Sequence, residues 1–286
     1  MSLIIAADNL NAVNPVVGQA LLTLDPHPLQ ELARRLEQAG ADLLDINPGY
    51  LAPRHLDRMA FMVEAVQEVT ELRLLLDSPN ARALARGLEV CRRPPLLNAC
   101  TLEDDKLRGI LPLAATHRTD LVMLLLDARS FPAASLEGKI TLAVELREQA
   151  LAAGLADEQL IFDPVLPNLT WPDAWEQTAA VVKSARLLSG GAIWPEPART
   201  MAGLSNLRSG LRHTYPVQLE EAVLGVLAGA GLQIALLDVL QPPLMTPSGS
   251  SIRGCDYHNC APPDPPRPSG PVLKLITLVY LTIRPR

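Results

Sequence analysis

The sequence predicts an α/β fold in which eight parallel strands close into a (β/α)8 TIM barrel, with an irregular Pro-rich C-terminal tail replacing or following the last helix. Three observations lead to this prediction. Short apolar runs alternate with longer segments of helical period, and the alternation occurs eight times. A helix between two strands returns the chain to the same end of the sheet, which makes the strands parallel. The eight repeats occupy about 240 residues, the usual size of a closed barrel.

The predicted strands are short and aliphatic, as strands buried on both faces are. They span residues 3–7, 42–46, 72–76, 95–99, 120–126, 160–162, 200–204 and 233–237. Amphipathic segments between them predict helices at residues 28–39, 56–69, 81–90, 103–116, 136–153, 172–188 and 216–230. Pro28 near a first turn, and Gly40, Gly154 and Gly231 after last turns, support these boundaries. A doubly wound open sheet stays an alternative, disfavoured because no glycine-rich phosphate loop follows the first strand.

The character of the chain changes after the eighth strand. No convincing eighth helix is visible, and prolines crowd residues 261–268, where they prevent helix formation. We therefore expect a barrel at residues 1–245 and an irregular tail at residues 246–286, either flexible or an altered C-terminus. Cys255, His258 and Cys260 lack the usual zinc spacing and a fourth ligand, so no metal site is predicted.

Composition excludes several classes of protein. Apolar residues make up 48% and aromatic residues 3%, so the core has to consist of aliphatic side chains. A net charge of -6 argues against nucleic-acid binding. Four cysteines in 286 residues indicate no disulfide framework, and the N-terminus has no basic segment of a signal peptide. The apolar run 272–283 contains Lys274 and is too short to cross a bilayer. We expect a soluble cytoplasmic protein.

Polar side chains follow all eight predicted strands. In a parallel barrel these positions meet at the carboxyl-terminal mouth, where substrates bind. One such aspartate often only caps a helix or closes a turn, but recurrence at every strand favours a common site. The residues are Asp8, Asn9, Asn11, Asp45, Asn47, Asp77, Asn98, Asp127, Asp163, Ser205, Asn206 and Asp238.

These residue types indicate the kind of ligand. No nucleophile has a neighbouring histidine, and no lysine follows a strand, which disfavours Schiff-base chemistry. Carboxylates accept hydrogen bonds from paired N–H groups, and carboxamides both donate and accept. The set therefore suits a flat heterocycle rich in N–H groups and ring nitrogens, such as a pterin.

Several segments, in order, resemble the pterin-binding barrel family, and within it the methyltetrahydrofolate:corrinoid methyltransferase branch. The resemblance covers residues 3 to 240. Another branch, dihydropteroate synthase, uses a Ser-Arg-Lys motif near strand seven, where this chain has Ser205-Asn206. The segments are residues 25–35, 39–47 (ending Asp45-Ile46-Asn47), Leu76-Asp77-Ser78-Pro79-Asn80, Leu97-Asn98-Ala99, Phe162-Asp163-Pro164 and Gly203-Leu204-Ser205-Asn206.

The resemblance implies a role for each matching residue. Asp77, Asn98 and Asp163 match positions that hydrogen-bond the pterin ring, and Asp45 lines the same site. Asn206 matches the asparagine beside N5, the atom that carries the methyl group, and is the expected catalytic residue. The remaining expected contacts to the pterin are Asn11, which matches a family asparagine after strand one, and Ser205.

The resemblance also implies the reaction and the partners. Reduced folate, as methyltetrahydrofolate or tetrahydrofolate, is the expected substrate in one-carbon metabolism. The methyl group passes between N5 and the cobalt of a cobalamin (corrinoid) carried by a partner corrinoid protein. The resemblance also implies a homodimer, as in members of the family.

Three alternatives stay open. The first is a condensation like that of dihydropteroate synthase, and the second is a pterin-binding barrel without catalysis. The third is a magnesium-dependent enzyme using Asp77 and Asp127, which needs a basic residue that the strand ends do not provide.

Overall fold

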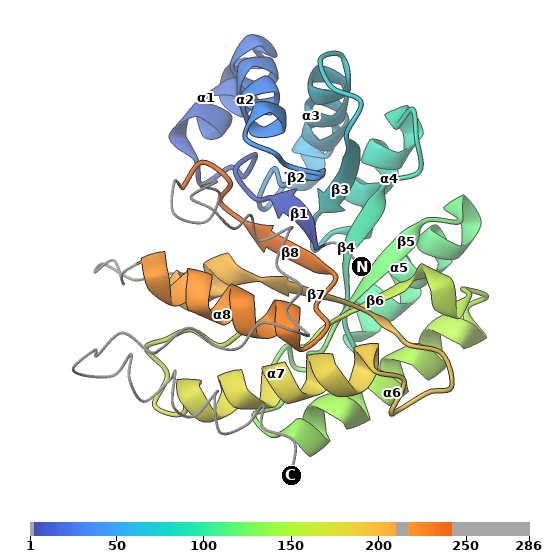
Figure 1. Cartoon of the computed structure of the whole chain (residues 1–286). Coiled ribbons are helices and arrows are strands. Elements are labelled where there is room, and N and C mark those ends of the chain that lie inside the picture. Colours follow the sequence, from blue (N-terminus) through green and yellow to red (C-terminus); the bar gives the residue numbers. More distant parts are fainter. Residues whose placement is uncertain (1–2, 210–216, 242–286) are drawn as a thin grey trace.

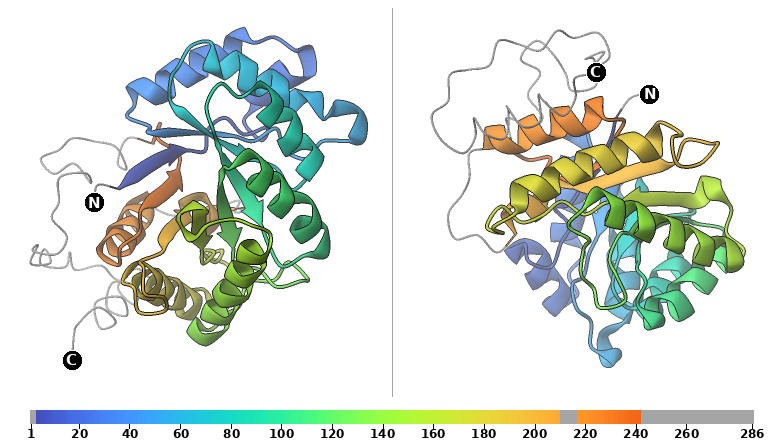
Figure 2. Two further views of the ribbon diagram at one scale, coloured as in Figure 1. Left: turned by 90° about the vertical axis from the view of Figure 1, so that its right-hand side faces the viewer. Right: turned by 90° about the horizontal axis from the view of Figure 1, so that it is seen from below.

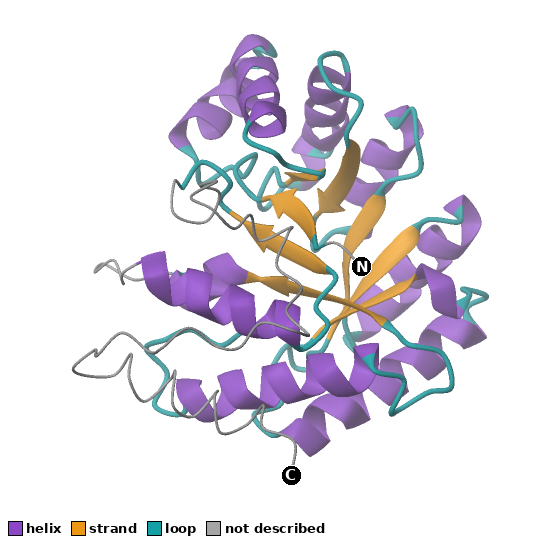
Figure 3. Ribbon diagram, in the orientation of Figure 1, coloured by secondary structure: helices purple, strands orange, loops and turns teal. Residues whose placement is uncertain are grey.

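Eight parallel strands pair in chain order around a closed barrel, and β8 returns to pair with β1 (Figures 1 and 3). The computed structural model describes residues 3–209 and 217–241. The fold predicted from the sequence is confirmed, and each strand lies within two residues of its predicted bounds. The strands are β1 (Ile4–Ala7), β2 (Leu43–Ile46), β3 (Arg73–Asp77), β4 (Leu96–Cys100), β5 (Asp120–Leu124), β6 (Leu160–Asp163), β7 (Arg199–Gly203) and β8 (Ile234–Leu237).

Helices cover the outside of the barrel (Figure 2). The predicted helices are present with shifts of one or two residues at most ends. They are α2 (His27–Gln38), α3 (Asp57–Gln67), α4 (Ala81–Val90), α5 (Asp104–His117), α6 (Leu136–Ala152), α7 (Ala174–Ser189) and α8 (Val217–Gly229). Three short 3-10 helices lie between these elements, namely η1 (Pro53–His55), η2 (Asp157–Gln159) and η3 (Leu204–Arg208).

One helix was not predicted. Helix α1 (Pro15–Thr23) precedes α2, so that two helices connect β1 to β2. Asn14 caps it by accepting a hydrogen bond from the N–H of Val16 at 3.0 Å. Its buried residues, Val17, Ala20 and Leu21, stand three and four residues apart, the spacing of a helix face.

The inside of the barrel is filled by aliphatic side chains. Neighbouring strands each contribute residues to one buried cluster: Ala6, Leu43, Leu75, Leu96, Val122, Ile161, Met201, Ile234 and Leu236. Side chains of a strand alternate between its two faces, so the residue two positions further along also points inward. Those next inward positions are Asp8, Asp45, Asp77, Asn98, Leu124, Asp163, Gly203 and Asp238. The polar site is therefore the layer directly above an aliphatic floor.

At the opposite end of the barrel, charged side chains of three strands form ion pairs. Arg73 contacts Asp120 at 2.8 Å, and Arg199 contacts the same carboxylate at 3.0 Å. These residues begin β3, β5 and β7. The carboxyl-terminal end thus provides the approach to the interior.

Two further predictions concern membrane-spanning segments and the C-terminal tail. Within the described ranges, no helix combines the length and the apolar character needed to cross a bilayer. The proposed tail, residues 246–286, lies outside the described residues, and with it the segment from Cys255 to Cys260.

Candidate active site

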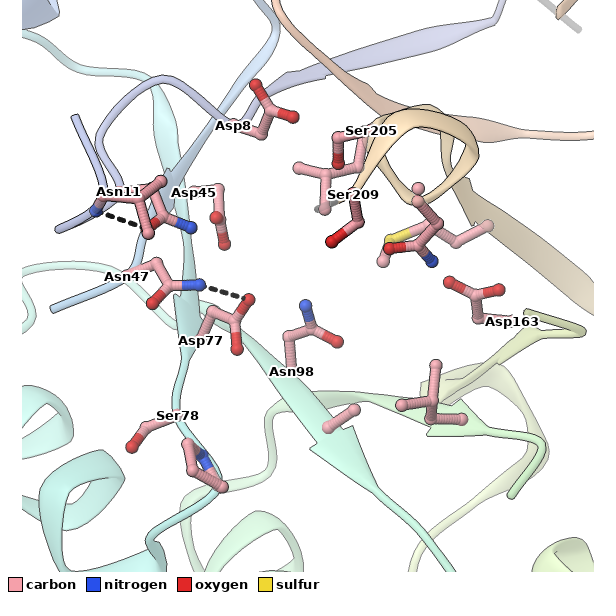
Figure 4. Close-up of a pocket in the computed structure, with 18 of the residues that line it drawn as sticks. Asp8, Asn11, Asp45, Asn47, Asp77, Ser78, Asn98, Asp163, Ser205 and Ser209 are labelled. Carbon is pink, nitrogen blue, oxygen red and sulfur yellow. Dashed lines mark hydrogen bonds between the residues drawn. The ribbon is translucent and has the colours of Figure 1, made fainter. Parts of the chain in front are cut away.

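A cavity of about 940 Å³ opens at the carboxyl ends of the strands (Figure 4). It brings together the residues that the family resemblance assigned to the pterin site: Asn11, Asp45, Asp77, Asn98, Asp163, Ser205 and Asn206. Asp8, Asn9, Asn47 and Asp238 line the same cavity. Strands far apart in the sequence therefore supply one polar cup.

Asp77 and Asn98 form the β3–β4 side of the cup. Asn47 donates to the Asp77 carboxylate at 2.9 Å and accepts from the N–H of Gly49 at 2.9 Å, which fixes its amide orientation. Burial raises the pKa of Asp77 to about 7, although hydrogen bonds from Asn47 and Asn98 favour the ionised form. Asp77 therefore changes charge near neutral pH.

Asp45 is the most deeply buried carboxyl group of the site, with 1% of its surface exposed. Burial and the neighbouring Asp77 and Asp8 hold its pKa well above the usual value. Its Oδ1 atom has no hydrogen-bond partner within the described part of the chain. A buried acceptor without a partner is costly, so this atom suits a ligand N–H group.

Asp163 faces the cup from the end of β6 and is 3% exposed. Its Oδ1 accepts from the N–H of Val165 at 2.8 Å. Burial raises the pKa of Asp163 to about 6, against the opposing effects of the Val165 N–H, the Lys139 ammonium and the Gly203 N–H. It is thus an ionised acceptor at neutral pH.

Asn206 occupies the β7 side of the cup. The inward position there is Gly203, and a Cβ atom at Gly203 would lie 3.5 Å from the Asn206 amide nitrogen. This is an ordinary van der Waals distance, so the Asn206 carboxamide, carried by η3, lies directly beside the end of β7. Next to it, Ser205 hydrogen-bonds Asp8. Burial and Asp238 raise the pKa of Asp8 to about 6.

Asp127 is a correction to the predicted ring of strand-end residues. Strand β5 ends at Leu124, two residues earlier than predicted, and Leu124 takes the inward position. Asp127 instead closes its own turn, accepting from the N–H groups of Arg129 at 2.8 Å and Phe131 at 2.9 Å. It lines a separate surface hollow beside α6. Asp127 is therefore an aspartate that closes a turn, the alternative role that the sequence allowed for a strand-end aspartate.

Two cationic residues also line the cavity, although neither ends a strand. Lys106 stands in the first turn of α5 and donates to the Pro79 carbonyl at 2.6 Å. Arg208 ends η3 and pairs with the buried carboxylate of Glu220. Inspecting the first turns of the helices at the mouth as well as the strand ends finds Lys106, and Arg208 lies in the segment that follows Asn206. Among the described residues, no three His, Cys, Asp or Glu side chains are grouped to hold a metal ion.

Comparison with known proteins agrees with this geometry. A family model described as pterin binding enzyme matches residues 11–235. The methylcorrinoid:tetrahydrofolate methyltransferase of Eubacterium limosum is 28% identical over 211 residues, covering 73% of this chain and 76% of that protein. Similar solved structures include dihydropteroate synthase of Yersinia pestis with a sulfonamide drug (TM-score 0.62, 17% identity, 98% and 94% of the two chains). The Thermus thermophilus dihydropteroate synthase is another (TM-score 0.61, 17% identity, 83% and 89%). At such identities the structural likeness shows the fold.

Proposed function

Because the chain belongs to the pterin-binding enzyme family, we propose that it moves the N5-methyl group between methyltetrahydrofolate and the cobalt of a corrinoid on a partner protein. The observation that carries this proposal is the acceptor-rich cup, in which Asp45, Asp77, Asn98 and Asp163 converge above an aliphatic floor. The relative from Eubacterium limosum supports the choice of reaction among those of the family.

The cup matches the hydrogen-bonding edge of a pterin. The ring carries an amino group and an adjacent ring N–H, which together form a row of donors. Asp163 and Asp77 offer acceptors to such donors, and the free Oδ1 of Asp45 offers another. Asn98 can both donate and accept hydrogen bonds, so it suits the part of the ring edge that carries donors and acceptors side by side. Binding would then supply a partner for Oδ1 of Asp45, which has none among the described residues.

Asn206 is the residue we assign to the reaction. A methyl group on a tertiary amine transfers slowly, because the departing nitrogen has to take up a bonding electron pair. Hydrogen bonding or protonation at N5 lowers this barrier. The Asn206 carboxamide stabilises the protonated N5 or holds a water molecule beside it. Asp8 and Ser205, in the same cluster, place a carboxyl group that exchanges protons near neutral pH close to Asn206.

The corrinoid supplies the cobalt atom that accepts or donates the methyl group, and it arrives with the partner. The cavity therefore has to be approachable from outside while folate is bound. Asn206 and Ser209 line it on the β7 side, and Ser205 and Ser209 are exposed, consistent with an accessible N5 region.

An anaerobic assay tests the proposal. Methyltetrahydrofolate and cob(I)alamin are mixed with and without the protein, and methylcobalamin formation is followed by absorbance. We expect transfer that requires the protein, and a corrinoid protein as acceptor should react faster than the free cofactor.

Two outcomes would contradict the proposal. Folate binding without transfer to free cob(I)alamin or to a corrinoid protein would indicate a pterin-binding barrel without catalysis. Condensation of p-aminobenzoate with a pterin pyrophosphate would instead assign the chain to the dihydropteroate synthase reaction.

A further inference from the structure

Lys139 is the one lysine among the buried residues of the described chain, and none of its surface is exposed. Lysine is almost never fully buried without a partner, because its charge loses its hydration. Lys139 also stands in the first turn of α6, where the helix dipole disfavours positive charge. Neither the burial nor the helix position explains a lysine here.

The contacts of Lys139 lead to the active site. Its Nζ atom donates to the carbonyl of Pro164 at 2.7 Å. Pro164 lies between Asp163 and Val165, whose N–H donates to the Asp163 carboxylate at 2.8 Å. One ammonium group thus anchors the three-residue turn that presents Asp163 to the cavity. Lys139 does not line the cavity, so its effect on a ligand has to pass through Asp163.

We propose that Lys139 is a positioning residue for Asp163, one that holds the turn through Pro164 and supplies the buried positive charge that keeps Asp163 a carboxylate toward the pterin. The proposal rests on the proposed function, because it assigns Asp163 to the pterin.

The charges around the two residues support this role. Lys139, from α6, is the charged side chain that lowers the pKa of Asp163. Asp163, from β6, is the charged side chain that raises the pKa of Lys139. The other carboxyl groups that line the cavity come from other elements, namely Asp8 after β1, Asp45 in β2, Asp77 in β3, Glu103 before α5 and Asp238 after β8. Burial lowers the pKa of Lys139 to about 8 and raises that of Asp163 to about 6, and each group opposes the shift of the other. Between these two values both groups are charged.

Removing the ammonium should shift the pH dependence of folate binding. Without Lys139 the pKa of Asp163 rises further, so a larger fraction of the protein carries a neutral Asp163 at a given pH. A protonated carboxyl is a weaker acceptor for pterin N–H groups. An increase of about one unit reduces the ionised fraction about tenfold at pH values below both pKa values, and the affinity with it.

The experiment compares Lys139→Met, which keeps the length of the side chain, with Lys139→Gln, which keeps a donor for Pro164 without the charge. Lys183→Met, on the exposed face of α7, is the matched control for loss of one positive charge. Calorimetry measures methyltetrahydrofolate affinity from about pH 5.5 to about pH 8.5, the range that spans the two groups. We expect both Lys139 variants to need a higher pH for full affinity, and Lys183→Met to follow the wild type.

A second readout is independent of the ligand. The ¹³C resonance of the Asp163 carboxyl, assigned with Asp163→Asn, should titrate at higher pH in both Lys139 variants. The inference would be overturned if the Asp163 titration did not change and the affinity fell equally at all pH values or not at all. Lys139 would then have only a packing role. If the wild type binds no folate, the proposed function fails, while the carboxyl titration still decides the role of Lys139.

Discussion

Asn206 takes the place that a strand side chain would fill at the end of β7. The strand offers Gly203 there, and the carboxamide comes from η3 instead. Asn206 is thus held by a short helix rather than by the sheet, and it lines the cavity on the β7 side. We therefore assign Asn206 to the transition state rather than to ground-state binding.

Asn206→Ala should reduce the rate of methyl transfer about 100-fold, because one preorganised hydrogen bond to a developing charge has about this effect. Methyltetrahydrofolate affinity should change less than about threefold, since the ring edge is bound elsewhere. Single-turnover kinetics and calorimetry measure the two quantities separately. Equal losses in rate and affinity would contradict a transition-state role.

Asp45 shows how a buried carboxyl group of the site affects stability. Its pKa is raised in the folded protein, so folding takes up a proton there at a pH where the unfolded chain is ionised. Stability therefore falls as pH rises from the unfolded pKa toward the folded one. The cost is small near the ordinary pKa of an aspartate and grows as pH rises from there.

Asp45→Asn should stabilise the ligand-free protein by about 1–3 kcal/mol at pH 8, because the amide removes the charge and can donate to Asp77. The gain should shrink toward pH 5, because the raised pKa of Asp45 costs less stability as pH falls toward the ordinary value. Urea unfolding at the two pH values measures the difference. A gain that does not depend on pH would show that Asp45 carries no unfavourable charge.

Residues on regular strands were predictable, and residues held by other elements were less so. Asp45, Asp77, Asn98 and Asp163 stand two positions beyond a buried residue of the barrel interior, a spacing visible in the sequence. Asp127 was misplaced because the strand ends earlier than its apolar run suggests. Lys139 gave no signal, since a lysine in a first helical turn normally faces solvent.

At the scale of helices and strands, the outer helices pack closely against the sheet. Helices α3 and α4 pack side by side over β3, where a Cβ atom at Gly87 of α4 would lie 2.8 Å from both the Leu76 and Met59 side chains. Both neighbours are fully buried and have little room to move. Gly87 therefore sets the distance between helix and strand beneath Asp77.

Gly87→Ala should destabilise the protein by about 1–3 kcal/mol through overpacking, reduced in part by better helix propensity. Gly225 of α8 is the matched control, because within the described part of the chain no atom outside the backbone of α8 lies within 4 Å of a Cβ added there. Gly225→Ala should stabilise by about 0.5–1 kcal/mol. Thermal unfolding of the two variants measures the contrast. If both variants gain stability, the close contact at Gly87 is not a constraint.

Helix boundaries were predictable where prolines and glycines mark them, as at Gly40 and Gly154, which both have positive φ. Helix α1 was missed although Asn14 and Pro15 form a recognisable start. Its buried face consists of three residues, and a single crossover helix was expected between two strands. An extra helix in one crossover leaves the strand order unchanged, so the barrel was still predicted correctly.

At the scale of the whole molecule, closure of the barrel is what creates the site. Strand β1 pairs with β8 from Ile4 opposite Ile234 to Ala7 opposite Leu237. This pairing brings Asp8 beside Asp238 and next to Ser205, although about 200 residues separate the first from the other two. We continue to propose that the barrel domain ends near residue 245, since the described strands complete the barrel before it.

Calorimetric titration of methyltetrahydrofolate tests most directly whether this cup is a pterin site. The wild type should bind one molecule per chain, and Asp77→Asn, Asn98→Ala and Asp163→Asn should each weaken binding about ten- to 100-fold, the effect of one hydrogen bond involving a charged or buried group. Asp127→Asn, a strand-end change outside the cavity, should bind like the wild type. Absence of binding by the wild type, or equal affinity in all four variants, would contradict the assignment.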